Sequence, residues 1–111
     1  MANLVRINIR VLDEQRETIQ YVNLGEGEVR CGLKTRYSAY DGRWYIWILA
    51  LDGELVTGPI KLVPGIDLLA GRKHDLRVPQ GQLFVYAADR EPPTKDTIDT
   101  DAVLFYRRVT T

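Results

Sequence analysis

The chain has 111 residues, enough for one domain, and its 15 basic residues balance 15 acidic residues, so the formal net charge is zero. This balance argues against a nucleic-acid binder, which normally carries a basic excess. Cys31 is the only cysteine, which excludes an intramolecular disulfide and a cysteine-based zinc site. Residues 1–6 lack the pattern of a signal peptide, and no apolar run approaches the ~20 residues of a membrane-spanning helix. We therefore expect a soluble protein, made in a cytoplasm, without nucleic-acid or membrane partners.

Apolar and polar residues alternate over the first third of the chain. Residues 4–12 and 28–37 each follow this period of two, which is typical of half-buried strands. A further strand is predicted over residues 18–24, with Ile19 and Tyr21 on one face and Val22 and Leu24 on the other. Two further strands are predicted over residues 43–51 and 54–62. Asp-Gly pairs at 41–42 and 52–53 precede them, so we expect a three-strand meander between residues 28 and 62.

The second half of the chain is less regular. Residues 63–71 combine turn residues with a short apolar segment, and residues 67–70 are predicted to form at most one turn of helix. Strands are predicted over residues 82–88 and 101–109, separated by a long polar loop over residues 89–101. In total about seven short strands are expected. We predict a single all-β domain over residues 1–111, a small antiparallel sandwich or open barrel.

The usual catalytic residue types are scarce. His74, the only histidine, lies in a polar stretch with no recognisable nucleophile or carboxylate partner, so an exposed loop histidine is expected. Cys31 is in phase with the apolar residues of its strand, which favours core packing over a reactive thiol. We expect no catalytic residues, no cofactor and no enzymatic activity.

Three aspartates of the long loop, Asp96, Asp99 and Asp101, raise the question of a calcium site. Their spacing is not that of a calcium-binding loop, and Arg90 and Lys95 share the segment. A solvated loop is the preferred interpretation, and no metal site is predicted.

The strand from Trp44 to Leu51 is apolar on both faces. A strand of a two-layer antiparallel domain should bury only one face. The second face is covered either within the chain, by barrel closure or by the loop over residues 89–101, or by a partner; Trp and Tyr are typical interface anchors. The interface candidates are Tyr45, Trp47, Leu49, Leu51, Pro92, Pro93 and Asp96.

A structural turn is predicted at Pro64, Gly65 and Asp67. Gly65 can adopt a positive φ, and the Asp67 side chain can cap the short turn that contains Leu68 and Leu69. Leu68 and Leu69 would then close one end of the domain.

Several segments together resemble a known family. They are Gly58-Pro59-Ile60-Lys61-Leu62-Val63-Pro64-Gly65-Ile66-Asp67-Leu68-Leu69, the tryptophan strand ending in Leu51-Asp52-Gly53, Pro79-Gln80-Gly81-Gln82-Leu83-Phe84-Val85, and Val103-Leu104-Phe105-Tyr106. This order, over roughly residues 28–108, is similar to the small plug-type baseplate proteins of contractile-tailed phages, known from cyanophages. The resemblance implies a virion structural protein of the tail baseplate, without enzymatic activity. It also implies hub, tube or wedge proteins, and further copies of the chain, as partners.

Two other functions remain open from the residues alone. The two tryptophans and six tyrosines could form stacking surfaces in a small ligand- or carbohydrate-binding module. A small enzyme is the other alternative, although no nucleophile or metal arrangement favours it.

Overall fold

The computed structural model describes residues 4–9, 17–24, 30–38, 40–94, 98 and 102–108. These residues form no helix, and the prediction of an all-β fold is confirmed. The seven strands are β1 (Leu4–Ile7), β2 (Glu17–Val22), β3 (Cys31–Ser38), β4 (Arg43–Leu49), β5 (Leu55–Lys61), β6 (Gln82–Ala87) and β7 (Ala102–Arg107).

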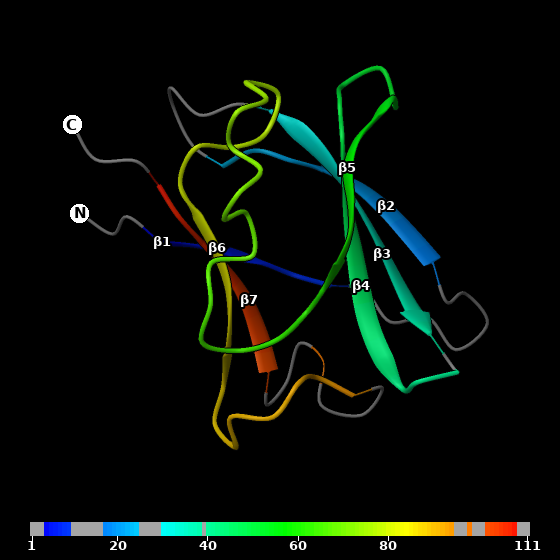
Figure 1. The fold of residues 1–111 in the computed structure, drawn as a ribbon, viewed down its shortest axis with the longest axis vertical. Helices are drawn as coiled ribbons and strands as arrows, with labels where there is room; N and C mark the ends of the chain where they lie inside the picture. The colour runs from blue at the N-terminus through cyan, green and yellow to red at the C-terminus, as the bar shows by residue number, and fades with distance from the viewer. Residues whose placement is uncertain are drawn as a thin grey trace.

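The strands form two antiparallel sheets that face each other across the core (Figure 1). One sheet has the order β2-β3-β4-β5 and the other the order β1-β7-β6. No described strand of one sheet pairs with a strand of the other, so the architecture is an open sandwich and not a closed barrel.

The predicted meander consists of β3, β4 and β5. Gly42 has a φ of 68° and Gly53 a φ of 89°, the left-handed conformation that a tight reversal needs and that glycine adopts without steric cost. β1 is shorter than predicted and ends at Ile7; of the rest of that segment, residues 10–12 lie outside the described residues.

The core lies between the two sheets and is built by alternation along the strands. The β2–β5 sheet contributes the buried Cys31, Leu33, Trp44, Ile46 and Ile48, and the opposite sheet contributes Ile7, Leu83, Leu104 and Tyr106. The Tyr106 hydroxyl, although fully buried, accepts a 2.8 Å hydrogen bond from the backbone N–H of Gly81. This hydrogen bond satisfies the buried N–H of Gly81.

The long connection between β5 and β6 completes one side of the core. It forms turns, not strands, and buries Leu62, Leu68, Leu69 and Val78. Gly65 has a φ of 85°, and nothing lies within 4 Å of the position that a Cβ would take there.

The Asp67 carboxylate links this connection to β6 through a hydrogen bond. Its Oδ1 accepts hydrogen bonds of 3.1 Å from the backbone N–H of Leu69, within the turn, and from that of Leu83 in β6. Its Oδ2 forms a 2.7 Å ion pair with the Lys73 ammonium. Burial raises the pKa of the Asp67 carboxyl, but the hydrogen bonds from Lys73, Leu69 and Leu83 outweigh burial, so the pKa is lowered.

Candidate functional site

The two faces of β4 have different surroundings. Trp44, Ile46 and Ile48 point into the core. The Trp44 indole N–H donates a 3.0 Å hydrogen bond to the carbonyl of Thr94, so the start of the predicted long loop packs against the inner side of this sheet. The other face of β4 points outward, away from the second sheet.

Strand register brings the outward side chains of the β2–β5 sheet into rows. One row joins Tyr21, Gly32, Leu49 and Leu55, a second joins Ile19, Lys34 and Trp47, and a third joins Glu17, Arg36, Tyr45 and Lys61. We call this surface, together with Leu51 in the β4–β5 turn, the tryptophan face. It is apolar toward the β4–β5 turn and basic toward the β3–β4 turn.

Trp47 is held in place on this face by its neighbours. A Cβ added to Gly58 would lie 2.7 Å from the Trp47 Cδ1, so the indole rests directly on the backbone of β5. The Lys34 ammonium lies 4.9 Å from the centroid of the same ring, a cation–π contact. Lys34 also forms a 3.6 Å ion pair with Glu17. The ring is therefore fixed before any partner arrives.

The Tyr21 ring likewise packs closely over a glycine of the neighbouring strand. A Cβ on Gly32 would lie 3.0 Å from the Tyr21 Cε1 and 3.3 Å from the Leu49 Cβ. The tyrosine ring thus crosses β3 over the glycine and reaches toward Leu49 of β4. Large aromatic rings that are already immobile lose little side-chain entropy on binding, which suits them as interface anchors.

The apolar half of the tryptophan face is open to solvent. The exposed fractions are 54% for Ile19, 56% for Tyr21, 55% for Leu55 and 61% for Leu51. Because the sandwich is open, barrel closure does not cover this face. The described part of the long loop does not cover it either, because it packs on the other side of the sheet. A contiguous exposed apolar surface of this kind is typical of an interaction site.

The basic half is ordered at the end nearest the β3–β4 turn. The Tyr45 hydroxyl donates a hydrogen bond to the carboxylate of Asp41. This bond lowers the pKa of Asp41 and raises that of Tyr45. Arg36 and Lys61 are exposed and form no ion pair with any described residue.

The interface candidates named from the sequence are thus divided by the structure. Tyr45 and Trp47 are half-buried and Leu51 is exposed, all on the tryptophan face, whereas Leu49 is 6% exposed beneath Tyr21. Pro93 is fully buried and is therefore left out of the surface proposed below. Pro92 is half-buried in the long loop, and Asp96 lies outside the described residues, as do Asp99 and Asp101.

Sequence reasoning missed Ile19, Tyr21 and Leu55 as members of the same surface. Their signal was present, because Ile19 and Tyr21 alternate with the inward-pointing residues of β2. The register that aligns them with Trp47 and Leu49 joins strands far apart in the sequence, and alternation within one strand does not define it.

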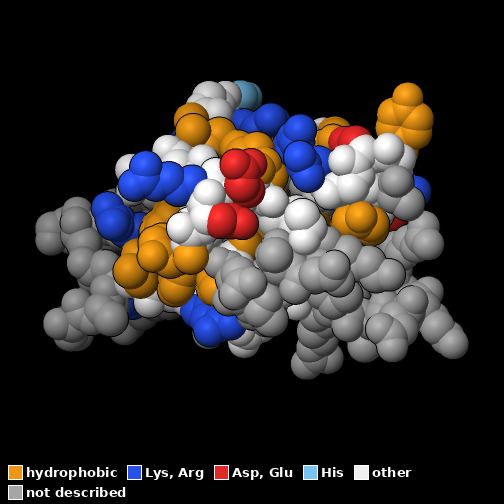
Figure 2. Space-filling model, turned by 90° about the horizontal axis from the view of Figure 1, so that it is seen from below, with side chains coloured by type: hydrophobic (Ala, Val, Ile, Leu, Met, Phe, Trp, Pro, Cys, Tyr) orange, Lys and Arg blue, Asp and Glu red, His pale blue; other side chains and the backbone are white. Residues whose placement is uncertain are grey.

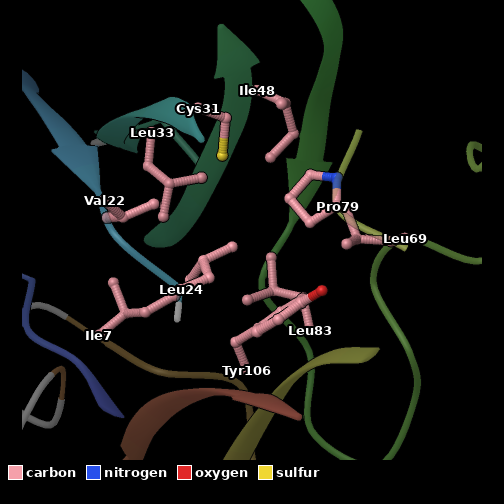
Figure 3. A pocket seen from close by; sticks show the side chains of 10 residues that line it. All are labelled: Ile7, Val22, Leu24, Cys31, Leu33, Ile48, Leu69, Pro79, Leu83 and Tyr106. Atoms are coloured by element: carbon pink, nitrogen blue, oxygen red, sulfur yellow. The ribbon is translucent and has the colours of Figure 1, made fainter. Parts of the chain in front are cut away.

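The cavity between the two sheets is too small for a ligand. A cavity of about 10 Å³ lies between the sheets, surrounded by apolar side chains that include Cys31, Leu69 and Pro79 (Figure 3). A space of this size without free polar partners stays dry. Burial raises the pKa of the Cys31 thiol to about 11, so this cysteine is protonated and unreactive at neutral pH. His74 is exposed.

The tryptophans do not form a stacking surface for sugars. Trp44 is 3% exposed, and the half-buried Trp47 ring contacts the backbone of Gly58 and the ammonium of Lys34. The two tryptophans therefore do not support the alternative of a carbohydrate-binding module.

Among the described residues, no three His, Cys, Asp or Glu side chains are grouped so as to hold a metal ion. No helix there is long and apolar enough to cross a membrane.

A small β sandwich with an apolar core and an open apolar face has the features of a structural protein that works within an assembly. The family model described as cyanophage baseplate Pam3 plug gp18 matches residues 4–109, so the chain belongs to this family of phage baseplate plug proteins. Membership supports a structural role in the baseplate of a phage tail, in association with other baseplate components. Among curated proteins, none matches the sequence.

Proposed function

We propose that the protein is a non-catalytic component of the baseplate of a contractile phage tail and that it binds a neighbouring baseplate protein through the tryptophan face. Its partners on this proposal are hub, tube or wedge proteins, and it is synthesised in the host cytoplasm before assembly. Family membership supports the baseplate setting. The observation that carries the proposed binding surface is the exposed apolar row beside the immobilised Trp47.

An uncovered tryptophan face is unfavourable for an isolated molecule in water. Exposed Tyr21, Leu51 and Leu55 keep apolar area in contact with water, and covering that area with a partner is favourable at roughly 25 cal/mol per Å². Fixed rings reduce the entropy that binding removes. The surface is therefore better suited to a permanent contact than to a free monomer.

Charged substitutions at exposed positions test this proposal without disturbing the core. Tyr21→Glu and Leu51→Glu should weaken binding to the baseplate protein that occupies the tryptophan face by about tenfold or more, because a carboxylate would be buried in an apolar contact. The binding assay uses the hub, tube and wedge proteins of the same phage, purified singly. Leu76→Glu is the matched control, since Leu76 is 79% exposed in the connection between β5 and β6.

The control should bind like the native protein, and circular dichroism should show all three variants folded. Native-like binding of every baseplate protein by both Tyr21→Glu and Leu51→Glu would overturn the proposed surface. Light scattering on the isolated protein tests separately whether the face pairs with a second copy.

A further inference from the structure

The outward side of the β1-β7-β6 sheet is a second surface of similar composition. Phe84 and Phe105 are register partners on adjacent strands, and their rings stack with centroids 5.9 Å apart. The Arg107 guanidinium lies 5.7 Å from the centroid of Phe84. Tyr86 and Leu4 are 62% and 45% exposed at the margins. We call this surface the phenylalanine face.

A groove adjoins the phenylalanine face. It is lined by Pro64 and Gly65 from the connection, by Val85, Tyr86 and Ala87 of β6, and by Arg90. The exposed Gly65 has no side chain to fill it, and no atom lies within 4 Å of its missing Cβ. The groove can therefore receive a side chain from a partner, with a guanidinium at its wall.

The charges of the molecule are not evenly distributed between strands and turns. The strands carry six basic residues and one acidic residue, Glu17; the basic residues are Arg6, Lys34, Arg36, Arg43, Lys61 and Arg107. All other described acidic residues lie in turns and connections. Figure 2, a view from below, shows acidic side chains near the centre with basic side chains around them.

Of the two faces, the phenylalanine face has the more one-sided charge, because the only charged residues of its strands are basic. The exposed Arg107 lies on it, and β1, β6 and β7 contain no acidic residue. Asp89 and Glu91 flank Arg90 in the chain, but neither lines the groove. An apolar surface whose strand charges are all positive is complementary to an apolar surface bordered by carboxylates.

The two faces point in opposite directions. Because the sheets pack against each other through their inner sides, the outer sides lie on opposite sides of the sandwich (Figure 1). A partner docked on one face leaves the other free. The domain therefore has the geometry of a bivalent connector.

We propose that the phenylalanine face is a second docking site, which binds an acidic, partly apolar surface of another baseplate protein. The domain is then held between two different neighbours. The assignment of the second face stands on its own observations, whereas the bridging role also rests on the proposed function of the tryptophan face.

The test separates the two faces by substitution. Arg107→Glu and Tyr86→Glu alter exposed positions of the phenylalanine face, and Arg36→Glu alters an exposed position of the tryptophan face. Binding is measured against each purified baseplate protein of the same phage, with folding checked by circular dichroism.

Arg107→Glu and Tyr86→Glu should weaken the binding of one partner by about tenfold or more and leave the binding of a second partner unchanged. Arg107→Lys should retain most of the binding, and Arg36→Glu should leave the Arg107-dependent partner unaffected.

Salt gives an independent readout. Affinity of the Arg107-dependent partner should fall when the salt concentration is raised from about 0.05 M to about 0.5 M, because the charge pairs are screened. The proposal is overturned if no baseplate protein depends on Arg107 and Tyr86. It is also overturned if Arg36→Glu removes the same partner, or if sedimentation shows that the Arg107-dependent contact is self-association. Loss of binding in Tyr21→Glu alone would concern the tryptophan face and leave the second site intact.

Discussion

The indole of Trp47 rests on the backbone of Gly58, where a methyl group would come within 2.7 Å of the ring and 2.9 Å of the Trp47 Cα. Gly58 also has a φ of 137°, a conformation that residues with a Cβ rarely adopt. The central anchor of the tryptophan face therefore depends on a missing side chain in the neighbouring strand.

Gly58→Ala should lower the free energy of unfolding by roughly 2 kcal/mol or more, since steric overlap adds to backbone strain. Urea denaturation measures the loss, and a shift in tryptophan emission reports displacement of the ring. Gly71→Ala is the control, because Gly71 has a φ of 78° but nothing within 4 Å of its missing Cβ. It should cost only about 1 kcal/mol. Equal losses in the two variants would show that Trp47 does not need this close approach.

Tyr106→Phe should destabilise the protein by about 1–3 kcal/mol, because the buried N–H of Gly81 loses its acceptor. The measurement is chemical denaturation, with Tyr86→Phe as a control at an exposed tyrosine. The control should change stability by less than about 0.5 kcal/mol. A Tyr106→Phe variant as stable as the native protein would mean that the N–H finds another partner.

Asp67→Ala should lower stability at neutral pH by about 2 kcal/mol, since the carboxylate accepts two backbone N–H groups and pairs with Lys73. Asp67→Asn keeps an acceptor for the N–H groups but loses the ion pair, so its loss should be smaller. Urea unfolding of both variants measures the difference.

The same residue predicts part of the acid sensitivity. The folded-state pKa of Asp67 is lowered, so its stabilisation is present above the unfolded pKa of about 3.9 and is lost as pH falls through the folded value. The free energy of unfolding of Asp67→Asn should therefore fall less than that of the native protein between about pH 6 and about pH 2.5. Asp52→Asn, at an exposed turn, is the comparison. Identical acid profiles for Asp67→Asn and the native protein would contradict the linkage.

Gly65→Val should destabilise the protein by at least about 1 kcal/mol, because the φ of 85° is unfavourable for a β-branched residue. The space around the position is open, so strain and not crowding causes the loss. Gly65→Asn tests this explanation, since asparagine tolerates the left-handed conformation better than valine. The melting temperature should fall clearly for valine and little for asparagine; equal melting temperatures would rule out backbone strain as the cause.

Much of the fold follows from the sequence through local rules. Alternation in residues 18–24 separates Ile19 and Tyr21 from the inward residues, and the Asp-Gly pairs locate both turns of the β3-β4-β5 meander. These signals are readable because side-chain direction in a strand depends only on position. The family resemblance was also carried by local segments, and the family match over residues 4–109 bears it out.

The surfaces depend on contacts between distant segments. The residues of β4 show that this strand has two apolar faces, but not which of them is open. Strand pairing and sheet packing settle this point, because they bury Trp44 and leave Tyr21 beside Leu49 on the outside. Likewise, Phe84 and Phe105 meet only through register, and Pro93 is buried although it belongs to a loop of polar composition. Burial is a property of the assembled layers, and no single strand contains the information about what packs against it.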